Sequence, residues 1–183
     1  RNYRDDNGLN ADINIRTHDI ATLGLWGPKA VNALGNFIDP NEIDIQNFPF
    51  VTAKNLTLNL SGGKKVDVWA ARISYVGESG WEIYFNNNKD DGLALYDSLL
   101  EVGVVPVGIE TYANSRRLEK SFRLQGADLE TEYTAIEAAI QRPLVKEADF
   151  HGKAAHLSHR EEDPCAILCT MTLDDLNVSG LPR

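Results

Sequence analysis

The middle of the chain alternates apolar and polar residues, and this pattern predicts a β-sheet. Between residues 56 and 60 every second position is leucine, as expected for a half-buried strand. Gly62-Gly63 follows and predicts a two-residue hairpin turn, because both glycines can adopt positive φ. The return strand is expected over residues 64–75. Its apolar parity shifts between Val68 and Trp69, which indicates either a β-bulge or a strand buried on both faces.

The segment Arg72–Glu82, with the sequence RISYVGESGWE, is the one around which we organise the rest of the chain. Its apolar alternation stops at Gly77 and Gly80 and resumes at Trp81, so the segment predicts a strand, a bend and a second strand. A phenol, Tyr75, and two carboxylates lie close to this bend. The bend is therefore the first place to look for a binding site.

Longer periods predict helices on either side of this sheet. Asn88 is suited to cap the clearest helix, which runs to Gly103, because Asp91 follows three residues later and an apolar stripe continues from there. Shorter patterns predict a strand at residues 20–26, helices at 27–35, 108–121, within 129–140 and at 151–161, and a strand at 166–173.

The order of these elements predicts an α+β fold with a mainly antiparallel sheet and helices on one face, compatible with a ferredoxin-like arrangement. The chain has 183 residues, 43% of them hydrophobic and 25% charged, which is typical of a soluble globular protein. A net charge of −9 argues against nucleic acid as the main partner. No apolar run approaches the roughly 18 residues of a membrane helix, so we expect no membrane partner.

Both ends of the sequence suggest a piece of a longer protein. The chain opens on Arg1, its only methionine is Met171, and it stops at Arg183 soon after a strand-like run. We therefore expect a fold that is truncated at both ends. The two cysteines, Cys165 and Cys169, make no disulfide framework, which favours a reducing compartment. Both are expected to be core thiols on one face of the last strand.

A basic cluster on the second predicted helix is the main concentration of positive charge: Arg116, Arg117, Lys120 and Arg123. It is either a solvated helix end, where cations suit the helix dipole, or a clamp for a carboxylate, with which arginine forms bidentate pairs. Our hypothesis is that this cluster and the bend at Tyr75 meet around a flat, anionic ligand.

Glu82 lies between Trp81 and Ile83 in a predicted strand, and a carboxylate that faces inward needs a partner. That partner is either Arg116 or Arg117, in a structural ion pair, or a ligand with an N–C–N donor edge, which a carboxylate binds through two parallel hydrogen bonds. The spacing does not separate these alternatives.

Three histidines near the end of the chain raise the question of a metal site: His151, His156 and His159. No cysteine joins them at a zinc-binding spacing, and an HxxH pair is common on solvated helices, so we expect no metal.

Four motifs together resemble the aminomethyltransferase family, whose folate-binding module belongs to the glycine cleavage T-protein and is shared by dimethylglycine and sarcosine dehydrogenases and oxidases. They are LGLWGP at residues 23–28, SYVGESGWE at 74–82, RLEK at 117–120 and DFHGK at 149–153. The resemblance covers about residues 18 to 176 and is closest to the dimethylglycine dehydrogenase branch.

This resemblance implies tetrahydrofolate as the ligand and one-carbon transfer from a small amine-derived donor as the function. Tyr75 matches the family's pocket tyrosine, Glu82 the glutamate that binds the pterin edge, and Arg117 an arginine that holds the folate. Trp81 and Phe122 are expected in the core instead. The resemblance also implies the possibility of FAD in a separate domain of the parent protein. A cytoplasmic protein is expected, in the mitochondrial matrix if the source is eukaryotic.

The sequence departs from the family where the chemistry is expected. No residue here matches the family's catalytic aspartate, so we assign no catalytic residue and expect the isolated chain not to turn over. A pocket tryptophan of the family is replaced by Gln125. By resemblance, residues 1–17 are a lead-in from a missing domain, 18–145 the folate-binding domain, and 146–183 a linker helix with the first strand of a truncated barrel.

Two alternatives to an enzyme module remain. One is a non-catalytic folate-binding protein with an assembly or regulatory role. Iron–sulfur-linked relatives of that kind carry a cysteine in the stretch that matches residues 119–126, and the absence of cysteine there argues against this alternative. The other is an interaction domain in which Glu82 and Arg117 merely pair with each other.

Overall fold

A computed structural model describes residues 2–140, 144–172 and 174. The chain divides into two compact units, Arg1–Gly108 and Ile109–Arg183. The first contains α1 (Asn2–Asp6), β1 (Ile20–Trp26), α2 (Ala30–Leu34), α3 (Pro40–Ile43), β2 (Ala53–Asn59), η1 (Ser61–Gly63), β3 (Lys65–Ala71), β4 (Gly80–Asn86) and α4 (Lys89–Glu101), and the second contains η2 (Thr111–Arg116), α5 (Arg117–Glu119) and α6 (Lys153–Glu161).

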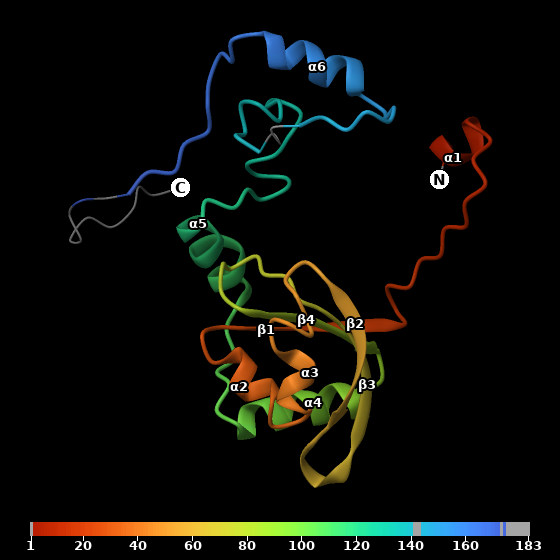
Figure 1. The fold of residues 1–183 in the computed structure, drawn as a ribbon, viewed down its shortest axis with the longest axis vertical. Helices are drawn as coiled ribbons and strands as arrows, with labels where there is room; N and C mark the ends of the chain where they lie inside the picture. Colours follow the sequence, from red (N-terminus) through yellow and green to blue (C-terminus); the bar gives the residue numbers. More distant parts are fainter. Residues whose placement is uncertain (1, 141–143, 173, 175–183) are drawn as a thin grey trace. The chain divides into compact units, whose positions relative to one another are not determined.

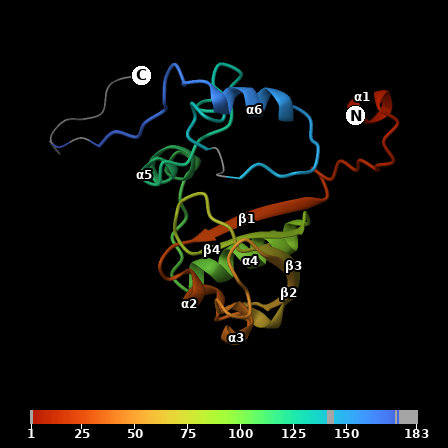
Figure 2. The same ribbon diagram turned by 45° about the horizontal axis from the view of Figure 1, so that its top comes forward.

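A four-stranded sheet in the order β1-β4-β3-β2 forms the centre of the first unit, and each neighbouring pair of strands is antiparallel. Helices α2, α3 and α4 all lie against one face of this sheet (Figures 1 and 2). The predicted α+β class, with a mainly antiparallel sheet and helices on one face, is confirmed.

The core lies between the sheet and these helices, because alternate strand residues point toward them. Leu58 and Ile83 from the strands and Leu34, Ile43 and Leu95 from the helices are completely buried. Burial of each such side chain contributes about 1.5–3 kcal/mol. Trp81 is also fully buried, as predicted.

The opposite face of the sheet is open and carries an aromatic residue that the sequence pattern misplaced. Trp69 is 46% exposed, and it pairs with Asn55 on β2 and Tyr84 on β4. The pairing of β2 with β3 is one-to-one over both strands, so the predicted bulge is absent. The side chains of β3 alternate between exposed and buried from Lys65 to Ala70, so the strand is not buried on both faces either. The apolar parity shifts because Trp69 lies on the open face beside another aromatic ring.

A hairpin turn is present at the predicted glycines, but it is not the two-residue turn predicted, because the Leu60 N–H donates to the Lys64 carbonyl and leaves the three residues Ser61–Gly63 between them. The strand that leaves the turn is also shorter than predicted. Gly62 and Gly63 have φ of 77° and 81°, in the region that favours glycine. The strand was predicted to continue to residue 75, but β3 ends at Ala71. The Ile73 N–H donates to the Ala71 carbonyl at 3.0 Å, a tight turn that removes the following residues from the ladder.

Arg72 follows the last residue of β3, and its side chain connects the loop after α3 to the sheet. Its Nη1 donates to the carbonyls of Ile43, Asp44 and Phe48 at 2.9, 3.0 and 2.8 Å, and its guanidinium lies 5.0 Å from the Trp81 ring centroid. Burial lowers the pKa of Arg72, although nearby Asp44 opposes this shift. This buried arginine therefore has a structural role.

The predicted helices are confirmed in the first unit and only partly in the second. Asn88 caps α4 by accepting from the Asp91 N–H at 2.8 Å, and α6 confirms the helix predicted at 151–161. The helix predicted over 108–121 is present, but its centre, η2, is a π-helix. Residues 129–140 form turns instead of a helix, and the described residues 166–172 form no strand.

Within the described part of the chain, no helix is both long enough and apolar enough to cross a membrane.

Candidate functional site

Glu82 projects from β4 onto the open face of the sheet, between two positions that lack bulky side chains. Its partners in the register are Gly24 on β1 and Ala71 on β3. Its side chain is half-buried. A glycine thus lies on one side of the carboxylate and an alanine on the other, and we call this group of residues the Glu82 notch (Gly24, Ala71 and Glu82).

Trp26 forms a wall next to this notch. A Cβ atom added to Gly24 would lie 2.0 Å from Cη2 and 2.1 Å from Cζ3 of the Trp26 indole, so the ring covers this glycine. The Trp26 Nε1–H donates to the Ile73 carbonyl at 3.0 Å. Trp26 thus connects β1 to the loop that carries Tyr75. Trp26 was predicted to lie in a strand, and no part in the site was predicted for it.

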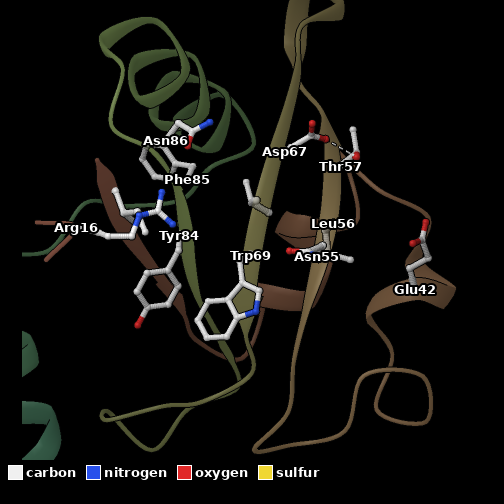
Figure 3. Close-up of a pocket in the computed structure, with 12 residues that line it drawn as sticks. Arg16, Glu42, Asn55, Leu56, Thr57, Asp67, Trp69, Tyr84, Phe85 and Asn86 are labelled. Atoms are coloured by element: carbon white, nitrogen blue, oxygen red, sulfur yellow. Dashed lines mark hydrogen bonds between the residues drawn. The ribbon is translucent and has the colours of Figure 1, made fainter. Parts of the chain in front are cut away.

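A phenol from the same strand contacts the carboxylate directly. The Tyr84 hydroxyl donates a hydrogen bond to Oε2 of Glu82. Tyr84 in turn packs against Trp69, with ring centroids 5.1 Å apart and planes inclined at 55° (Figure 3). Because side chains two apart on a strand share a face, the sequence could have indicated Tyr84 as a neighbour of Glu82.

A broad hollow of about 1090 Å³ continues along the open face from Tyr84 and Trp69. Polar side chains supply much of its lining, among them Asn55 and the hydrogen-bonded pair Thr57 and Asp67, whose oxygens are 2.6 Å apart (Figure 3). The open face therefore combines aromatic surface with hydrogen-bonding groups, as small-molecule sites do.

Tyr75 lies in the loop between β3 and β4 and is half-buried. This loop bends at Gly77, where φ is 72°, and the Glu78 N–H donates to the Ser74 hydroxyl at 3.2 Å. The hydrogen bond from Trp26 to Ile73 holds the loop two residues before Tyr75. The assignment of Tyr75 as a ligand contact stays a prediction.

Arg117 belongs to the second unit, where its side chain is almost fully buried. Its Nε donates to the Ala113 carbonyl at 2.7 Å, and its Nη1 donates to the Phe122 carbonyl and to a carboxylate oxygen of Asp128. Within the described residues, its Nη2 makes no hydrogen bond. Its role in folate binding also stays a prediction.

The other arginines of the basic cluster have structural partners too. Arg116 pairs with Glu119 at 2.8 Å on the surface. Arg123 donates to the carbonyls of Ser121, Ala138 and Leu168 at 3.1, 2.9 and 2.8 Å. Arg123 thus connects segments that are far apart in the sequence of the second unit.

Of the two alternatives for the partner of Glu82, the ion pair with Arg116 or Arg117 is not found among the residues that the structure describes. Glu82 accepts from Tyr84, and Arg117 forms its ion pair with Asp128. Asp128, which also accepts from the Leu124 N–H at 2.9 Å, was missed because its partner lies 11 residues earlier, beyond any helical or strand spacing.

Three further side chains differ from expectation in their exposure. Phe122 is 37% exposed, and Cys165 and Cys169 are both exposed, so none of the three lies in the core. The cysteines were assigned to a buried strand, and the described residues there form no strand to bury them.

Comparison with known proteins identifies the class. A family described as "GCVT N-terminal domain" matches residues 1–147. The chain belongs to this family.

Its relatives fall into two groups. Human "Dimethylglycine dehydrogenase, mitochondrial" is 32% identical over 181 residues, which are 94% of this chain and 20% of that protein. "Aminomethyltransferase" of Staphylococcus carnosus is 31% identical over 193 residues, covering all of this chain and 48% of that protein, and that of Bacillus licheniformis is 30% identical over 183 residues, covering 96% and 47%. The chain spans between a fifth and about half of the length of these relatives.

Proposed function

We propose that this protein binds a reduced folate at the Glu82 notch and serves in tetrahydrofolate-dependent one-carbon transfer. The observation that carries the proposal is the carboxylate of Glu82, held on an open sheet face between Gly24 and Ala71. Membership in a family whose relatives are named aminomethyltransferase and dimethylglycine dehydrogenase supports it.

The residues present fit a pterin. An ionised carboxylate accepts hydrogen bonds at both oxygens, and a planar N–C–N edge presents two parallel donors to it. The indole of Trp26, which covers Gly24, and the phenol of Tyr84 supply aromatic surface beside the Glu82 carboxylate. Tyr75, on the adjoining loop, contributes an additional aromatic contact to this proposed site.

Arg117 is proposed as a further folate-binding residue, as the family resemblance implies, with Nη2 as the donor. The other donors of its guanidinium are fixed by Ala113, Phe122 and Asp128, so the remaining edge is already oriented. Such preorganisation reduces the entropy lost on binding.

Tetrahydrofolate, when bound, supplies the nitrogen that accepts the one-carbon unit. The residues of this chain bind and orient that cofactor, and none of them is assigned to the proton transfer. The donor is a small amine-derived compound, and a flavin, if the parent protein uses one, belongs to a separate domain. We place the protein in the cytoplasm, or in the mitochondrial matrix of a eukaryotic source, as the name of the human relative suggests.

The test is a titration of tetrahydrofolate into the protein and into Glu82→Gln. The substitution replaces an acceptor by a donor against the pterin edge, so affinity is expected to fall by at least about tenfold, equivalent to about 1.4 kcal/mol. Glu101→Gln, the same change at an exposed position of α4, serves as the matched control and should bind like wild type. Equal affinity of Glu82→Gln and wild type, with both folded, refutes the site.

A further inference from the structure

The hydrogen bond between Tyr84 and Glu82 has a consequence for ligand selectivity. We propose that Tyr84 is a positioning residue: it fixes the orientation of the Glu82 carboxylate and thereby sets the preference for a ligand with an N–C–N donor edge. This inference rests on the proposed function, since it concerns the same carboxylate.

The surroundings of Glu82 leave the orientation of the carboxylate to Tyr84. The neighbours of Glu82 on the open face are Gly24 and Ala71 across the sheet, and Gly80 and Tyr84 along β4. Of these four residues, only Tyr84 has a hydrogen-bonding side chain. The indole of Trp26 covers Gly24, but its Nε1–H donates to the Ile73 carbonyl. The last torsion of a glutamate is broad, so a carboxylate without such a donor samples many orientations. The donor at Oε2 restricts this torsion.

Tyr84 is itself held in place by its cross-strand neighbour. Trp69 lies directly opposite it in the register, and their rings contact each other on the open face (Figure 3). Aromatic pairs of this kind contribute to stability beyond the area that they bury. Trp69, Tyr84 and Glu82 thus form a continuous series of contacts that ends at the carboxylate.

Orientation matters more for one class of ligand than for another. A ligand with two parallel donors needs both carboxylate oxygens in one plane with its N–C–N edge, whereas a ligand with one donor tolerates rotation. Loss of the Tyr84 hydroxyl should therefore reduce affinity for the two-donor ligand more than for the one-donor ligand. A purely structural role would weaken both equally.

The experiment measures binding of tetrahydrofolate and of its 2-desamino counterpart to the protein and to Tyr84→Phe. Wild type is expected to prefer tetrahydrofolate, and Tyr84→Phe to lose about tenfold in affinity for it but less than about twofold for the 2-desamino ligand. Tyr96→Phe, which removes a hydroxyl from a partly exposed tyrosine on α4, is the control and should change neither affinity.

The outcomes separate this inference from the function on which it rests. If Glu82→Gln leaves tetrahydrofolate binding unchanged, the proposed function fails. If Glu82→Gln weakens binding but Tyr84→Phe leaves the preference between the two ligands unchanged, the positioning role fails and the function stands. Trp69→Leu offers a second variant that keeps the hydroxyl, and it should reduce the same preference about threefold. An unchanged preference in that variant also contradicts the series of contacts.

Discussion

The residues around Glu82 show how much of a candidate site depends on the register between strands. Glu82 and Tyr84 share a face because strand residues alternate, and this could be predicted from the sequence. Gly24 lies opposite Glu82 only because of the register of β1 against β4, which brings together residues 58 positions apart. No local pattern contains that information, so the Glu82 notch and its Trp26 wall could not be predicted from the sequence.

Replacement of Gly24 by alanine tests the notch at this scale. The added Cβ would lie only 2.0 Å from Cη2 of the Trp26 indole, so the ring must move. We expect the free energy of unfolding to fall by about 1–3 kcal/mol, measured by urea denaturation, with a loss of folate affinity. Thr22→Val, on the same strand and face, should change stability by less than about 0.5 kcal/mol. A Gly24→Ala protein as stable as wild type would show that the ring does not cover this glycine.

The elements that were predicted correctly carry their own local signals. The helix α4 has a capping residue, Asn88, and an apolar stripe, and both act within the helix itself. The failed predictions depended on partners elsewhere. The apolar alternation after residue 165 has no paired strand among the described residues. The spacing that predicted a helix at 108–121 does not distinguish an α-helix from the π-helix η2.

The first turn of α4 also makes stability depend on pH. Hydrogen bonds from the side chain of Asn88 and from Lys64 hold the pKa of Asp91 below its ordinary value of 3.8. A lowered pKa means that the folded state favours the carboxylate, so Asp91 stabilises the fold above its unfolded pKa. This contribution is lost as pH falls through the folded-state pKa.

Asp91→Asn isolates that contribution. At pH 7 the variant should be less stable than wild type by up to about 1 kcal/mol, as expected for a group near the surface. At a pH below the lowered folded-state pKa the difference should shrink toward zero, because the wild-type carboxyl is then protonated. Urea unfolding at both pH values measures it. A difference that is the same at both would assign the effect to something other than charge.

At the scale of the whole molecule, family membership and the α+β class are established, while the ligand follows from a few side chains. The aromatic Trp69 illustrates why: an apolar residue in a strand usually indicates core, but here it lies on the open face beside Tyr84. One face of the sheet packs against α2, α3 and α4, and the other face bears the proposed site.

The central claim is that the Glu82 carboxylate binds the pterin edge of a reduced folate. An experimental structure of the protein with tetrahydrofolate bound tests it most directly. Our account predicts the N–C–N edge of the pterin within about 3 Å of the Glu82 oxygens, with the Tyr84 hydroxyl still on Oε2. A pterin bound elsewhere, with Glu82 free of it, would contradict the account.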